Sequence, residues 1–293
     1  MKRNVRIVAI CLLAVTALML TGCISIEKSQ VCSGITKAEN SLFTSDGRLF
    51  VTGGDSVWEV HKDYSTTKLA TPACSTITGI VQRGNYIYAN CNTGNIALGT
   101  ARSFLIAASL SQPAPAFSIV QQYDRACMAN GMAVAPDGSF YIANSTGVVS
   151  SMLKVVISST DPMKVTEQRV WLSWGGLFPN GVEYKNNYIY YTALNTMRRV
   201  EIRGNDPGPV ETLYTNVEFL DDFCIIGDKI IVADFINGKL IALDLTGKLL
   251  GQTSQYKFNT PTSVTEAKGP IFGTQGVLVT EQLSGKVWFV TGN

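Results

Sequence analysis

The chain of 293 residues carries 24 lysine and arginine residues against 22 aspartate and glutamate residues, and 46% of its residues are hydrophobic. This length allows one large domain or two small ones. The balanced charge argues against a nucleic-acid-binding protein, which would show a basic excess or a basic stripe. The single histidine, His61, stands alone, so no Ser-His-Asp or Cys-His nucleophile can be assembled.

The first residues predict an export signal. Three basic residues precede an apolar run over residues 7–20, which is shorter than the about 20 apolar residues that a membrane span needs. The run ends in Leu-Thr-Gly-Cys at residues 20–23, which resembles a bacterial lipobox. We therefore expect residues 1–22 to be removed and Cys23 to carry the lipid that anchors the protein to a membrane. An ordinary signal peptide with an incidental cysteine is the alternative.

The segment after the cleavage site, residues 23–38, is expected to be a lipidated tether, part of which can also supply a strand to the domain. Ile24 follows the cysteine, where an aspartate would favour retention at an inner membrane. We expect the protein in the cell envelope, at the outer membrane if the host is Gram-negative.

Five cysteines remain besides the acylated one, and export permits disulfides among them. They are Cys32, Cys74, Cys91, Cys127 and Cys224. An odd number cannot pair completely. Cys74 and Cys91 are nearest in sequence and flank one expected hairpin, so they are the first candidates for a disulfide, while the remaining pairing stays open.

Six segments of residues 39–293 share one pattern, in which a short apolar strand, a turn of glycine, asparagine or aspartate, and a second strand rich in tyrosine, valine and isoleucine follow one another. The segments begin near residues 39, 79, 130, 180, 221 and 261. Repeats of about 40 to 50 residues with three or four strands each are typical of propeller blades. The sequence therefore predicts an all-β, six-bladed β-propeller over residues 39–293.

Four of the six repeats begin with a side chain that offers a hard oxygen donor: Glu39, Asn130, Asn180 and Asp221, with Asp222 beside the last. The start of each blade's innermost strand faces the central tunnel, so these side chains are expected to converge. Ca²⁺ and Mg²⁺ prefer carboxylate and amide oxygens. The pattern predicts one divalent cation in the tunnel, although any one of these anchors alone is more often a turn residue than a metal ligand.

Four segments, three of which contain the anchors Glu39, Asn180 and Asp221, resemble the SMP-30/gluconolactonase family: residues 39–43 (Glu-Asn-Ser-Leu-Phe), 179–181 (Pro-Asn-Gly), 221–225 (Asp-Asp-Phe-Cys-Ile) and 237–244. The resemblance implies a six-bladed propeller that hydrolyses sugar lactones with a single tunnel cation. It implies that Glu39, Asn180 and Asp221 bind the metal and that Asn130 contacts the substrate. Ca²⁺ is the first expectation, with Mg²⁺, Mn²⁺ and Zn²⁺ as alternatives.

The chain departs from the family pattern at two places. Residues 220–223 read Leu-Asp-Asp-Phe where the family has Pro-Asp-Gly-Met, which leaves open whether Asp221 or Asp222 faces the tunnel. The family's substrate-contacting arginine, two residues before Asn130, is replaced by Met128.

Two functions remain compatible with these residues. The first is a monomeric, metal-dependent hydrolase of small lactones or esters, in which Asp221 or Asp222 is the general base and Asn130 orients the substrate. The second is a non-catalytic envelope propeller that binds a ligand or a partner protein on its tunnel face. In the second case the anchor side chains would be splayed apart or engaged in turn hydrogen bonds.

Overall fold

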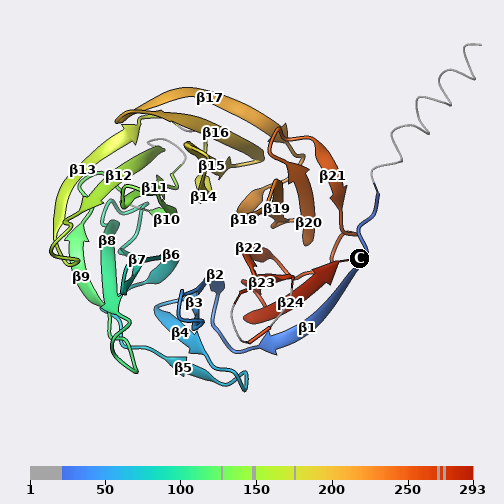
Figure 1. Ribbon diagram of the computed structural model, residues 1–293, viewed down its shortest axis with the longest axis horizontal. Coiled ribbons are helices and arrows are strands. Elements are labelled where there is room, and N and C mark those ends of the chain that lie inside the picture. The colour runs from blue at the N-terminus through green and yellow to red at the C-terminus, as the bar shows by residue number, and fades with distance from the viewer. Residues whose placement is uncertain are drawn as a thin grey trace, which may run out of the picture.

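The computed structural model describes residues 22–126, 128–146, 150–174, 176–268, 271–272 and 275–292. Within these ranges, 24 strands form six antiparallel sheets of four strands each. The sheets surround a common axis, with one strand of each sheet near the centre (Figure 1). The expected all-β fold with six blades is therefore confirmed. The described part of the chain holds no helix long and apolar enough to cross a membrane.

The first three blades follow one another directly along the chain, each running from its innermost to its outermost strand. Blade one contains β2 (Ala38–Phe43), β3 (Leu49–Gly53), β4 (Ser56–Val60) and β5 (Thr66–Lys68). Blade two contains β6 (Thr76–Arg83), β7 (Tyr86–Thr93), β8 (Arg102–Ser109) and β9 (Ser118–Gln122). Blade three contains β10 (Ala129–Val134), β11 (Ser139–Asn144), β12 (Ser151–Ile157) and β13 (Val165–Leu172).

The last three blades complete the ring. Blade four contains β14 (Pro179–Lys185), β15 (Tyr188–Ala193), β16 (Thr196–Arg203) and β17 (Asp206–Thr215). Blade five contains β18 (Leu220–Ile226), β19 (Lys229–Asp234), β20 (Lys239–Asp244) and β21 (Leu249–Gln252). Blade six contains β22 (Pro261–Glu266), β23 (Val277–Glu281), β24 (Lys286–Gly292) and β1 (Ile26–Cys32).

The ring is closed by the N-terminal segment. β1 pairs antiparallel with β24, from Ile26 opposite Gly292 to Gln30 opposite Trp288, so the two ends of the chain share blade six. β1 is thus the strand that residues 23–38 were expected to be able to supply, and it occupies seven of the residues of the expected tether. Only residues 22–25 of the described chain precede β1, and Ile24 donates a backbone hydrogen bond of 2.8 Å to Gln252. Cys23 is exposed at this edge.

All six innermost strands run in the same direction along the axis, which gives the propeller two distinct faces. We call the face at which these strands begin the upper face, and the face at which they end the lower face. Because strands in a blade alternate in direction, β1 begins at the lower face, as the pairing of Ile26 with Gly292 requires. Cys23, three residues before β1, therefore lies at the lower face.

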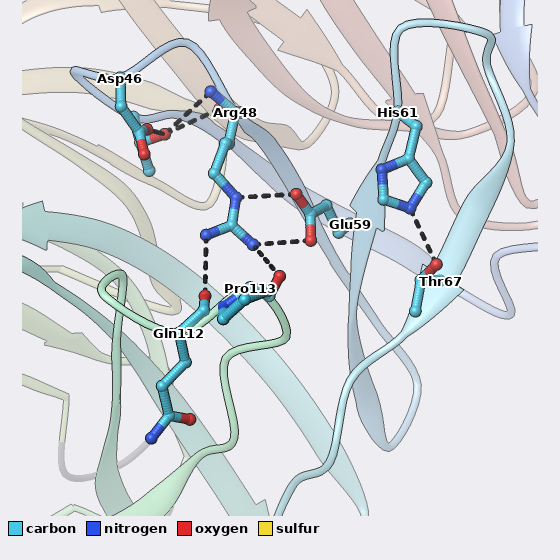
Figure 2. A network of polar contacts seen from close by, with 8 residues as sticks. Asp46, Arg48, Glu59, His61, Thr67, Gln112 and Pro113 are labelled. Carbon is cyan, nitrogen blue, oxygen red and sulfur yellow. Dashed lines mark hydrogen bonds and ion pairs between the residues drawn. The ribbon is translucent and has the colours of Figure 1, made fainter.

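Apolar side chains between neighbouring blades form the core. Phe50 of blade one, for example, packs in one cluster with Ile80 and Ile87 of blade two. A polar latch joins the same two blades at the lower face, where Arg48 donates two hydrogen bonds of 2.8 Å to Glu59 and others to the carbonyls of Gln112 and Pro113 (Figure 2). The ring of His61, which is partly exposed, forms a hydrogen bond of 2.8 Å with Thr67 (Figure 2).

The expected disulfide is confirmed. Cys74, in the connection before β6, is bonded to Cys91 in β7, at a sequence separation of 17. Cys32 and Cys224 are buried free thiols. Cys127 lies outside the described residues.

Candidate functional site

Every innermost strand carries an irregularity close to its start, directly after the first residue in five blades and after the second residue in β6. The register against the neighbouring strand breaks between residues 38 and 41, 77 and 80, 129 and 132, 179 and 182, 220 and 223, and 261 and 263. Such bulges redirect side chains out of the normal alternation of a strand. The bulges define a ring of six residues around the top of the tunnel: Glu39, Thr78, Asn130, Asn180, Asp221 and Thr262.

The ring contains all four anchors that the sequence singled out. Asn130 and Asn180 are each 6% exposed and Asp221 is 4% exposed, while Glu39 is partly buried. The side chains of Asn180 and Glu39 both lie close enough to act on the carboxyl group of Asp221: burial and then the charge of Glu39 raise its pKa, and the amide of Asn180 opposes that rise. The three expected metal ligands are therefore neighbours in space, although they come from blades one, four and five.

The residue after each ring position explains why the strands can approach so closely. It is glycine in blades two, three and four, and a Cβ atom on Gly131 would clash with the backbone of Asn180 and Gly181. A Cβ atom on Gly181 would likewise clash with Asp222, whose carboxylate occupies the space that the missing side chain leaves. These glycines are required by close packing of neighbouring backbones.

Side chains of the second strands fix the backbone of the ring. Thr192 accepts a hydrogen bond of 2.9 Å from the Gly181 N–H and donates one of 2.5 Å to the carbonyl of Asp221 in the next blade. Thr280 donates to the carbonyl of Glu39 at 2.8 Å in the same way, again across a blade boundary. Threonine side chains of the preceding blades thus hold the main chain at Asp221 and Glu39. The side chains of Asp221 and Glu39 themselves are not needed to fix the backbone.

The carboxyl groups of the ring lie in an electrostatically unfavourable setting. Burial, followed by the charges of Glu39 and Asp222, raises the pKa of Asp221 well above its ordinary value. Burial also raises the pKa of Glu39 to about 7, with a hydrogen bond from Gln282 opposing the rise and the charge of Asp222 adding to it. Uncompensated buried carboxylates are costly, so this arrangement favours either protonation or a bound cation.

The donor set fits a hard divalent cation. Asp221 Oδ1 is buried and has no hydrogen-bond partner, so it is free to coordinate. Within the described ranges, no group of three or more histidine, cysteine, aspartate or glutamate side chains is arranged to hold a metal. A site here therefore needs the amide oxygen of Asn180 besides the carboxylates of Glu39 and Asp221, which is a donor set suited to Ca²⁺ or Mg²⁺.

Asp222 faces a different part of the tunnel from Asp221. Its Oδ2 accepts a hydrogen bond of 2.7 Å from Asn40 of blade one, and its Oδ1 accepts one of 2.8 Å from the Phe223 N–H. Asn40 and Asp222 both line a cavity of about 310 Å³ that extends from this level towards the lower face. Burial raises the pKa of Asp222 to about 6, against these two hydrogen bonds.

Two residues at the tunnel were not singled out from the sequence. Glu183, three residues after Asn180, lines the same cavity, and burial followed by the charge of Asp222 raises its pKa to about 8. Gln282 reaches Glu39 Oε2 at 3.4 Å from the turn between β23 and β24. Glu183 could have been found by following the alternation of β14 beyond its bulge, whereas nothing in the sequence connects Gln282 with Glu39.

Solved structures share the fold over nearly the whole chain. A putative gluconolactonase has a TM-score of 0.69 at 12% identity, covering 92% of this chain and 93% of its own. Regucalcin of Agrobacterium tumefaciens, described as a calcium-binding protein, has a TM-score of 0.66 at 14% identity, covering 92% and 96%. An auxiliary nutrient binding protein of Bacteroides thetaiotaomicron has a TM-score of 0.71 at 9% identity, covering 92% of this chain and 77% of its own.

No protein-family model matches the chain, and no curated protein matches it in sequence. The similar structures include both a gluconolactonase and a nutrient-binding protein, and their identities to this chain are low. The expected resemblance to gluconolactonase and regucalcin is thus confirmed at the level of the fold: the chain is a six-bladed β-propeller of the architecture that those proteins share.

Proposed function

We propose that this protein is a divalent-metal-dependent hydrolase of small lactones or esters. The observation that carries the proposal is the unpartnered, buried Oδ1 of Asp221 in a ring that also presents Glu39 and Asn180. Structural likeness supports it, because one protein with this fold is described as a putative gluconolactonase and another, regucalcin, as a calcium-binding protein. We propose Ca²⁺ as the cation.

Each ring residue has a part in this reaction. A divalent cation bound here supplies a Lewis acid that polarises a carbonyl group. Glu39, Asn180 and Asp221 hold it, and Asn130, in the neighbouring blade, orients the substrate through its amide. We propose Asp222 as the general base, because Asp221 is engaged as a ligand and the pKa of Asp222, about 6, lies close to neutral pH. Asp222 lines the cavity below the ring, so the attacking water would come from that side.

The test is hydrolysis by the purified protein after removal of metals and separate refilling with Ca²⁺, Mg²⁺, Mn²⁺ and Zn²⁺. We expect metal-dependent opening of at least one lactone in a broad panel, and loss of that activity in Asp221→Asn. Asp228→Asn is the matched control, because it removes the same charge from an exposed turn at the lower face. If no refilled form opens a lactone or cleaves an ester, the protein is not this hydrolase and the ligand-binding alternative takes its place.

We further propose that the mature protein is anchored in the cell envelope through a lipid on Cys23. The thiol is exposed and precedes β1 by three residues, at the lower face. A lipid there would direct the ring of Glu39, Asn180 and Asp221 away from the membrane. Incorporation of labelled palmitate by cells that express the wild type, and its loss in Cys23→Ser, tests this; equal labelling of both proteins contradicts it.

A further inference from the structure

Exposed apolar side chains are distributed unequally between the two faces. Among the described residues, thirteen large hydrophobic side chains are exposed, and nine of them belong to connections at the upper face. The other four are Tyr64 at the lower face and Ile119, Val210 and Leu250 on outermost strands. The face that carries the proposed site is therefore the apolar one.

Part of this apolar surface comes from residues that directly precede the ring in the sequence. Met128, Phe178 and Phe219 occupy one equivalent position, two residues before the ring residue, in blades three, four and five. Phe178 is 41% exposed and Met128 and Phe219 are partly exposed. We call these three side chains the apolar arc, because they come from consecutive blades and directly precede Asn130, Asn180 and Asp221.

Phe178 adopts a backbone conformation that is unusual for a bulky residue. Its φ is 47°, in the left-handed region that bulky residues avoid and that glycine or asparagine adopts at lower cost. Lys37 and Thr260, at the equivalent positions of blades one and six, share this conformation with φ values of 51° and 53°. Three of the six blades thus share this conformation, and in blade four a phenylalanine stands where glycine or asparagine would be less strained.

The remainder of the tunnel mouth is polar at the same position. Blades six, one and two place Thr260, Lys37 and Thr76 there. A ligand that enters the tunnel therefore meets an apolar half and a polar half. A membrane is a poor candidate to cover the apolar half, because the proposed lipid at Cys23 lies at the opposite face.

We infer that the substrates of this site carry an apolar alkyl or aryl substituent, which packs on Met128, Phe178 and Phe219 while the carbonyl group reaches the ring. This inference rests on the proposed hydrolase function and narrows its substrate class. The hydroxyl groups of a sugar lactone would lose hydrogen bonds to water against the apolar arc, which disfavours such a substrate. Each methylene that the arc buries improves binding by up to about fourfold.

The experiment is a series of γ-lactones with alkyl chains of none, two, four and six carbons, beside glucono-δ-lactone, on the Ca²⁺-loaded protein. We expect kcat/KM to rise by roughly two- to fourfold per methylene over the first few methylenes. In Phe178→Asn, which keeps a residue suited to positive φ, this rise is expected to flatten. Tyr64→Asn is the matched control, because Tyr64 is 45% exposed at φ 66° on the lower face.

The outcomes separate the substrate class from the reaction. If kcat/KM is independent of chain length, if glucono-δ-lactone is preferred, or if Tyr64→Asn flattens the rise as Phe178→Asn does, the inference is overturned. If nothing is hydrolysed, the proposed reaction fails. Calorimetric binding of γ-lactams with the same alkyl chains then tests whether the apolar arc binds an apolar substituent. Affinity that rises with chain length and falls in Phe178→Asn supports the apolar arc, and affinity independent of chain length contradicts it.

Discussion

Glu183 offers a quantitative test of the electrostatics in the tunnel. Its carboxyl group lines the cavity on the lower side of the ring, and burial together with the charges of Asp222 and Glu266 raises its pKa from 4.5 to about 8, with Lys268 opposing the rise. The substitution Glu183→Gln keeps the size of the side chain and removes its charge. We expect it to stabilise the protein at alkaline pH and to leave the stability at pH 4 nearly unchanged.

The sign and size of the expected stability change follow from the pKa of Glu183 in the folded and in the unfolded protein. A carboxyl group whose pKa is higher in the folded than in the unfolded state costs no stability below pH 4.5, and its cost grows as the pH rises towards 8. A shift of about 3.5 units corresponds to at most about 5 kcal/mol, since one unit is worth about 1.4 kcal/mol. Because Glu183 is only partly buried, solvent screens the charge, and we expect a gain of about 2 kcal/mol for Glu183→Gln above pH 8.

The measurement is urea unfolding of both proteins between pH 4 and pH 9. Glu27→Gln is the control, because Glu27 is exposed on the outermost strand of blade six. We expect the difference in unfolding free energy to open between pH 4.5 and pH 8 for Glu183→Gln and to stay flat for Glu27→Gln. A constant difference across the whole range would refute the assignment of a raised pKa to Glu183.

Three further variants test contacts that hold the propeller together. Arg48→Met leaves Glu59, which is 8% exposed, without its partner, and is expected to lower the unfolding free energy by about 3 kcal/mol. The double variant Arg48→Met/Glu59→Leu is expected to regain most of this stability. Equal losses of stability in the single and the double variant would contradict the latch. Replacing Cys74 and Cys91 by serine opens a loop of 17 residues and is expected to cost about 3 kcal/mol in denaturant unfolding. Gly181→Ala forces a Cβ atom into the neighbouring inner strand and is expected to cost about 2 kcal/mol or more, whereas a neutral result would contradict that close approach.

The repeating architecture was accessible from the sequence because its signals are local. Glycine, asparagine and aspartate mark the hairpin turns, and apolar strands follow them at a regular interval. A strand within residues 23–38 was foreseen, but its bounds and its partner were not, since Ile26–Cys32 has mostly exposed residues and β24 lies at the other end of the chain. A strand that is paired over such a sequence distance leaves no local pattern to recognise.

The candidate site was predictable to the extent that it follows the repeat. Glu39, Asn130, Asn180 and Asp221 were found because one equivalent position recurs in each blade. The difference between Asp221 and Asp222 was not predictable, because it depends on the bulge in β18 and on the space beside Gly181.

The apolar arc was likewise not predictable from the sequence alone. The sequence revealed Met128 as a departure from the family pattern. That Phe178 and Phe219 occupy the equivalent position in the next two blades became clear only from the bulges in the structure.

The claim that Glu39, Asn180 and Asp221 together bind one divalent cation is tested most directly by calorimetric titration of the metal-free mature protein with Ca²⁺. We predict one bound ion per chain, a thermal midpoint that rises with Ca²⁺ concentration, and the loss of both effects in Asp221→Asn. Equal Ca²⁺ binding by the wild type and Asp221→Asn, or no binding of Ca²⁺, Mg²⁺, Mn²⁺ or Zn²⁺ by the wild type, would contradict the site.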